Sequence, residues 1–135
     1  MSVEELMADL KASEGSAELD SRMQAALEPD RHAAGVFPPD CTTNLVAAIQ
    51  MLKRVFPGWS WRVAECSVSD DAWLAPDFNC PRHGEGLRGM YSQAFDWAGM
   101  TDVDLRPSGR VPVALCMSML KARQLTESGL HGAGT

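Results

Sequence analysis

The sequence predicts one α+β domain, in which a small, mostly antiparallel β-sheet is sandwiched between α-helices (an alpha-beta-alpha sandwich). Apolar residues recur at helical spacing towards both ends of the chain and alternate at strand spacing between them. The turns between the expected strands are too short for parallel crossovers, which favours antiparallel pairing. A chain of 135 residues can bury a core without metal or disulfide support.

Residues 1–30 are expected to form an acidic helical leader. Leu6 and Leu10 recur at helical spacing, and Ser16 is placed to cap a second helix that runs to about Leu27. Two helices this short are marginal in isolation, so we expect the leader to pack on another part of the chain or to fray. The next stretch, "PDRHAAGVFPPDC", has three prolines and a glycine without any period and predicts a connecting loop.

The stretch "TTNLVAAIQMLKRVF" gives the clearest helical pattern. Thr42 or Thr43 is expected to cap this helix, and Pro57 with Gly58 is expected to end it. Its wet side carries a basic pair near the C-terminal end, which complements the helix dipole. Its apolar row consists of Leu45, Ile49, Leu52 and Phe56.

Strand periodicity begins directly after this helix. Trp59, Trp61 and Val63 alternate with polar or small residues, and "AWLA" suggests a second strand after a turn. Residues 76–89 read as a long polar loop, and residues 90–97 suggest a third strand, although a helix there is also possible. The following stretch, "GMTDVDLRPSGR", predicts a second loop.

A closing helix is expected in "VPVALCMSMLKARQLTE", with Pro112 in its first turn. These elements divide the chain into the leader, a sandwich body over 42–124 and a loose tail over 125–135. The expected core of the body comprises Leu45, Ile49, Leu52, Trp59, Trp61, Val63, Leu115 and Met119.

The pair of tryptophans in "GWSWRV" allows two interpretations. They could form a platform on which bases of single-stranded nucleic acid stack, or they could be buried in the core. Burying two indoles is worth several kcal/mol at about 25 cal/mol per Å². We favour the core, because the helix just before them carries an apolar stripe that needs a partner.

The distribution of charge argues against nucleic acid as a partner. The formal net charge is -6, and the first forty residues carry nine acids against three bases, whereas the remainder is neutral. A basic stripe of the kind that binds phosphates is therefore missing. An acidic leader would suit solubility or docking to a basic protein surface.

The chain is expected to be cytoplasmic. Its opening residues, "MSVEELMADL", are acidic where a secretory signal would be basic, and no apolar run is long enough to span a bilayer. In that compartment the four cysteines should be free thiols.

A metal site or a nucleophile could use Cys80 and His83, which share the polar loop at the spacing of a zinc knuckle. A structural zinc site normally has four ligands, and the other cysteines and histidines are isolated. No catalytic motif accompanies the pair. We therefore expect no cofactor, and keep a small metal-binding or hydrolytic protein as the alternative. The same loop could serve as an interaction surface through Asp77, Asn79, Arg82, His83 and Arg88.

Two stretches of the chain resemble a known family. "CTTNLVAAIQMLKRVFPGWSWRV" and "VPVALCMSMLKAR" are similar to the central helix-strand segment and the closing helix of the phage ABA-sandwich domain family, and "AELDSRMQAAL" resembles its leading helix. Val111 departs from the threonine that usually precedes the closing helix. The resemblance implies the sandwich and a phage or prophage origin, and it implies no established activity.

Together these observations predict a non-enzymatic accessory protein of phage or prophage origin. Loops on a rigid scaffold are where binding usually resides. We expect a protein partner or self-association, with no role for nucleic acid or membrane. The setting would be the cytoplasm of the host cell, with association with the virion as a further option.

Overall fold

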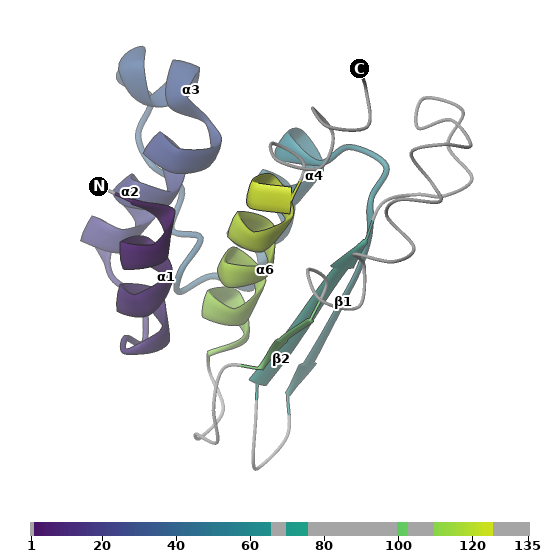
Figure 1. Cartoon of the computed structure of the whole chain (residues 1–135). Coiled ribbons are helices and arrows are strands. Elements are labelled where there is room, and N and C mark those ends of the chain that lie inside the picture. Colours follow the sequence, from purple (N-terminus) through teal and green to yellow (C-terminus); the bar gives the residue numbers. More distant parts are fainter. Residues whose placement is uncertain (1, 66–69, 76–99, 103–109, 126–135) are drawn as a thin grey trace.

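The structure is a computed structural model that describes residues 2–65, 70–75, 100–102 and 110–125 (Figure 1). Helices account for most of the described chain. They are 9, 11, 5, 11 and 15 residues long, whereas the strands have 6, 6 and 3 residues. In chain order the elements are α1 (Val3–Lys11), α2 (Ala17–Leu27), α3 (Pro29–Ala33), α4 (Leu45–Val55), β1 (Ser60–Glu65), β2 (Asp70–Ala75), β3 (Met100–Asp102) and α6 (Val111–Leu125).

Serine side chains start the first two helices. The hydroxyl oxygen of Ser2 accepts a hydrogen bond from the amide of Glu5, and that of Ser16 accepts one from Leu19 at 3.1 Å. The predicted second helix, capped by Ser16 and ending at Leu27, is confirmed. The leucines of both helices are buried in the core, so the acidic leader packs on the rest of the molecule and does not fray from it.

The predicted loop after Leu27 needs a correction. Residues Pro29–Ala33 form the short helix α3, because a proline at the first helical position has a favourable φ and no amide to satisfy. The cap of α4 also differs from the prediction. The capping residue is Asn44, whose Oδ1 accepts hydrogen bonds from the amides of Val46 at 3.0 Å and Ala47 at 3.3 Å.

The three strands form one antiparallel sheet in the order β1-β2-β3. Ser60 pairs with Ala75 and Glu65 with Asp70, so β2 is longer than the "AWLA" of the prediction. β3 occupies a stretch that was predicted to be loop, and it pairs Met100 with Trp73. The strand expected at 90–97 and the polar loop at 76–89 lie outside the described residues.

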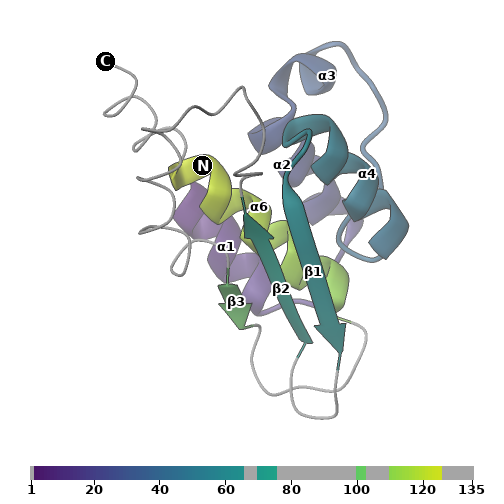
Figure 2. The same ribbon diagram turned by 90° about the vertical axis from the view of Figure 1, so that its right-hand side faces the viewer.

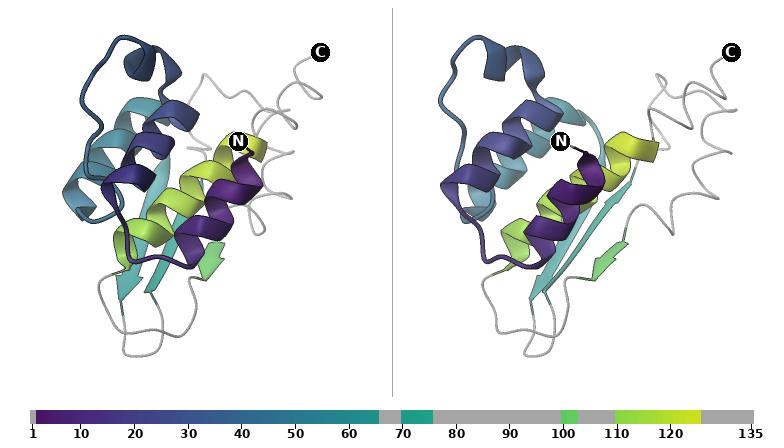
Figure 3. Two further views of the ribbon diagram at one scale, coloured as in Figure 1. Left: turned by 90° about the vertical axis from the view of Figure 1, so that its left-hand side faces the viewer. Right: turned by 60° about the vertical axis from the view of Figure 1, so that its left-hand side comes forward.

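The predicted alpha-beta-alpha sandwich is wrong. All described helices lie on one side of the sheet, and none of them covers its other face (Figures 1 and 2). The middle layer contains α6. One side of α6 packs on the sheet and the other side packs on α1 and α2, while α4 lies beside it (Figure 3).

The sequence of α6 explains this arrangement. Every residue from Val111 to Leu120 is buried, including Ser118, whose hydroxyl donates to the carbonyl of Ala72 in β2 at 3.2 Å. A helix that is apolar all round must be covered on all sides. Of these residues, the sequence predicted only Leu115 and Met119 to be in the core.

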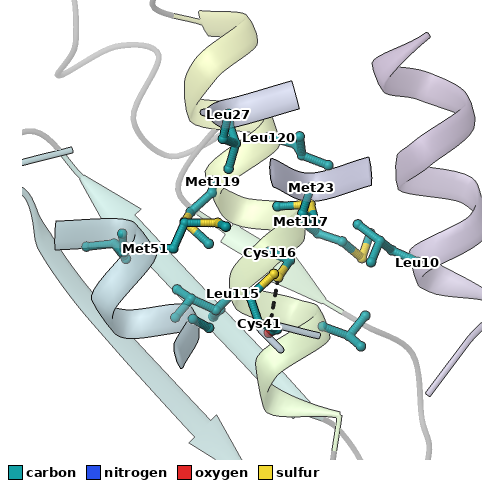
Figure 4. Packing of buried hydrophobic residues seen from close by; sticks show 14 of the residues in the cluster. Leu10, Met23, Leu27, Cys41, Met51, Leu115, Cys116, Met117, Met119 and Leu120 are labelled. Atoms are coloured by element: carbon teal, nitrogen blue, oxygen red, sulfur yellow. Dashed lines mark hydrogen bonds between the residues drawn. The ribbon is translucent and has the colours of Figure 1, made fainter. Parts of the chain in front are cut away.

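The core surrounds α6 (Figure 4). Leucines and methionines of α1, α2 and α4 meet Leu115 and Met119, which were correctly predicted to be buried, as was Leu52. The other members of the predicted core are only partly buried and pack against it: Leu45, Ile49, Trp59, Trp61 and Val63. The ring of Trp59 lies 4.9 Å from that of Phe56, centroid to centroid. The tryptophans therefore contribute to packing.

Candidate functional site

The candidate residues from the sequence all fall in a part of the chain that the structure does not describe. Cys80 and His83, and the possible interaction loop of Asp77, Asn79, Arg82 and Arg88, lie within 76–99. Across the ranges that are described, no three or more His, Cys, Asp or Glu side chains come together as metal ligands would. The sequence did not predict the surface around Phe37 that the structure presents instead.

A different surface emerges at the loop between α3 and α4. Phe37 is 89% exposed, by far the most exposed large apolar side chain among the described residues. Together with Pro38 it borders a hollow of about 400 Å³, which Ala17, Asp20 and Asp40 also line. The surface of the hollow is almost entirely apolar, as in many binding sites.

Gln24 of α2 fixes the loop on the side before Phe37. Its side chain is fully buried, and its Nε2 donates to the carbonyl of Val36 at 3.1 Å. Its Oε1 lies 3.1 Å from Nδ1 of His32 in α3. The backbone next to Phe37 is therefore held to the body of the protein by a partly buried hydrogen bond, which restrains the loop.

Asp20 of α2 fixes the loop on the other side. Its Oδ1 accepts from the amide of Thr42 at 2.9 Å and also from the hydroxyl of Thr42. The same hydroxyl oxygen accepts from the amide of Ser16 at 3.0 Å. Because Thr42 is fully buried in this network, it cannot cap α4, which explains why Asn44 does so.

Phe37 is therefore exposed on a loop that is clamped at both ends. Exposing a phenylalanine forgoes about 1.5–3 kcal/mol of burial free energy. A clamped loop also loses little conformational entropy when a partner binds to it. The arrangement suits a preformed contact surface.

Ion pairs neutralise some of the acids in the first forty residues. Glu28 accepts two hydrogen bonds of 2.9 Å from Arg54, and Asp9 pairs with Arg22 at 2.8 Å. The hydrogen bonds that Arg54 donates to Glu28 raise the pKa of Arg54. Asp40, which lines the hollow, and Glu18, which is close to Asp20 in the sequence, are exposed and form no such ion pair within the described residues.

The buried thiols offer no reactive centre. Cys41 and Cys116 are both free and fully buried, and the thiol of Cys116 lies 3.4 Å from the carbonyl oxygen of Cys41 (Figure 4). A hydrogen bond with Cys41 and then burial raise the pKa of Cys116 well above that of an ordinary thiol. Since the thiolate is the nucleophile, Cys116 is suited to packing and not to catalysis.

Comparisons with known proteins add no relative. No protein-family model, no curated protein and no solved structure matches the chain. Among the helices of the described chain, none is long and apolar enough to cross a membrane.

The sequence held only a weak indication of this surface. An adjacent Val36 and Phe37 stand in an otherwise polar and proline-rich stretch, which is unusual for a plain connecting loop. No local sequence pattern predicts the burial of Asp20, because its partner Thr42 is distant in sequence and the burial follows only from the tertiary fold.

Proposed function

We propose that this chain is a non-enzymatic accessory protein that binds another protein through the surface formed by Phe37, Pro38, Ala17, Asp20 and Asp40. The observation that carries the proposal is the exposure of Phe37 on a loop that hydrogen bonds to Gln24 and Asp20 hold on both sides. Aromatic side chains in such positions supply large contact areas and are enriched in the centres of interfaces.

The proposed setting is the host cell of a phage or prophage. The origin rests on the resemblance of the α4-to-β1 segment and of α6 to phage proteins. Cys41 and Cys116 are free, buried thiols, which fits the proposed reducing compartment.

Co-purification tests this function. The tagged wild-type chain, Phe37→Ala and Val46→Ala would be isolated from cells that carry the phage or prophage. Val46 is the matched control, because it is the other large apolar side chain with high exposure, 62%, among the described residues and lies outside the hollow. We expect one polypeptide in fixed ratio with the wild-type chain and Val46→Ala, and its loss with Phe37→Ala. Equal recovery with all three variants contradicts the proposal.

A further inference from the structure

Phe37, Pro38 and Pro39 form a short segment that the chemistry of proline holds extended. The segment belongs to neither a helix nor a strand. The ring of a proline fixes its φ at about −65°, and a residue that precedes a proline is restricted to the β and polyproline II regions. Phe37 and Pro38 both precede a proline. These restrictions favour the left-handed polyproline II conformation over 37–39.

Backbone polar groups of this segment are available to a partner. The amide of Phe37 and the carbonyls of Phe37 and Pro38 have no hydrogen-bond partner among the described residues. The carbonyls on either side, those of Val36 and Pro39, already accept hydrogen bonds within the chain, at 3.1 and 2.8 Å. The ring of Phe37 is exposed, and both prolines are partly exposed. The segment therefore presents apolar rings together with two free carbonyls.

A polyproline II segment of this kind fits one type of protein surface. Because the conformation has no internal hydrogen bonds, its carbonyls are left for a partner. Proteins that recognise such segments bind them in grooves lined by aromatic side chains. Tryptophan and tyrosine suit these grooves, because their rings pack on proline while the indole N–H or the phenol O–H donates to a carbonyl.

The surroundings of the segment also favour binding. Hydrogen bonds to Gln24 and Asp20 hold the loop on both sides, and a segment that is already ordered loses little conformational entropy when it binds. Asp40 follows the segment, is exposed and forms no ion pair within the described residues. A basic residue at the rim of the groove would complement this charge.

We infer that residues 37–39 are a polyproline II ligand, which the partner protein receives in a groove lined by tryptophan or tyrosine. The rings of Phe37 and the prolines pack on the aromatic walls, and a donor of the groove binds the carbonyl of Phe37 or Pro38. This inference rests on the proposed function, because it names the class of partner that binds through the same surface.

Peptide competition tests the inference. The tagged wild-type chain with its captured polypeptide is challenged with Gly-Val-Phe-Pro-Pro-Asp-Gly, which reproduces residues 35–40 before an added glycine, or with the scrambled peptide Gly-Pro-Val-Asp-Pro-Phe-Gly. We expect the first peptide to release the polypeptide at a concentration at least about tenfold lower than the second. Neither peptide contains tryptophan or tyrosine, so the emission of these residues in the isolated polypeptide should change when the first peptide is added.

Variants of the full chain separate backbone restriction from apolar contact. Pro38→Val and Pro39→Val keep an apolar side chain but release the backbone, and each should weaken capture about fivefold. Pro29→Val is the matched control, because Pro29 is an exposed proline at the start of α3, outside the segment, and the change should alter capture less than about twofold. Urea denaturation of each variant separates a loss of binding from a loss of fold.

Four results overturn the inference: equal release by the two peptides, unchanged emission of the isolated polypeptide, undiminished capture by both Pro38→Val and Pro39→Val, or an equal loss with Pro29→Val. If a variant does not fold, the competition still decides, because it uses the wild-type chain. Any of these results, with the polypeptide still lost in Phe37→Ala, removes polyproline II recognition alone. Equal recovery with Phe37→Ala and the wild-type chain removes the proposed function and this inference together.

Discussion

At the scale of single residues, Arg110 is a buried charge that stabilises the fold. It is only 2% exposed, and its guanidinium donates to the carbonyls of Leu10, Lys11 and Ser13 at the end of α1. The last carbonyls of a helix lack partners within the helix and carry its negative dipole end, so a cation there is favourable. Arg123 has a similar role at the end of α2, where it donates to the carbonyl of Leu27 at 3.3 Å.

Removing the guanidinium of Arg110 should therefore destabilise the whole domain. Arg110→Ala removes the side-chain donor to the carbonyls of Leu10, Lys11 and Ser13 and leaves a cavity in place of a buried side chain, so we expect a loss of about 3 kcal/mol in the free energy of unfolding. Arg110→Lys keeps the charge but has fewer hydrogen-bond donors, so its free energy of unfolding should lie between those of the wild type and Arg110→Ala. Urea denaturation measures both, with the exposed Lys53→Ala as control. A change below about 0.5 kcal/mol for Arg110→Ala would contradict this role.

The raised pKa of Cys116 predicts a loss of stability in alkali. Its folded pKa lies above the unfolded value, so the stability it contributes is complete below the ordinary thiol pKa and declines as pH rises from there towards the folded pKa. We expect the free energy of unfolding to fall between pH 8 and about pH 10, and to fall less in Cys116→Ala. Identical pH profiles for the two proteins would refute the assignment.

At the scale of elements, the caps decide where helices begin. Asn44→Ala should cost about 1 kcal/mol, because two amides at the start of α4 lose their acceptor. Thr43→Ala is the neighbouring control and should cost much less, since its hydroxyl makes only a long contact of 3.4 Å with the carbonyl of Asp40. Thermal denaturation of the two variants compares them. Equal costs would mean that Asn44 is not the effective cap.

Gly15, between α1 and α2, and Gly35, after α3, allow a test of how tightly the two turns are packed. Gly15 and Gly35 both have positive φ, 103° and 79°. A methyl group at Gly35 would meet nothing, whereas one at Gly15 would meet the backbone carbonyl of Thr42. Gly35→Ala should cost about 1–2 kcal/mol from backbone strain, and Gly15→Ala should cost about 1–3 kcal/mol more from the clash. Chemical denaturation that ranked them in the reverse order would contradict the close packing of this turn.

These elements also show which features the sequence could predict. Periodicity and serine caps are local, so α2, α4 and the burial of Leu115 and Met119 could be anticipated. The layer order could not, because an apolar stripe does not reveal which neighbour will cover it. β3 was missed because three residues carry too little pattern, and its strand form depends on pairing with β2.

The binding surface was missed for a related reason. The exposure of Phe37 and the burial of Asp20 both result from contacts between α2 and the loop before α4, which are distant in sequence. The composition of the polar loop over 76–89 predicted a functional surface there, and this stays a prediction, because those residues are outside the described part of the chain.

For the whole molecule, the defining feature is a central helix between a sheet and a second helical layer (Figure 3). Amides in such an element exchange with solvent only through global unfolding. The amides in the middle of α6 should therefore exchange most slowly of all the described elements, and those of α3, which has no buried residue, among the fastest. Hydrogen exchange followed by mass spectrometry would show this order, and fast exchange in α6 would contradict the layering.

The central claim is that Phe37 is a binding residue, exposed on a loop that hydrogen bonds hold on both sides. Site-specific photo-crosslinking from position 37 tests this claim most directly. A photoreactive phenylalanine analogue at position 37 should form one discrete crosslink to another polypeptide in phage-carrying cells, and Asp40→Asn should weaken it. The same analogue at position 46 should form none. Crosslinks of equal yield from both positions, or none from position 37, would contradict a binding role for this surface.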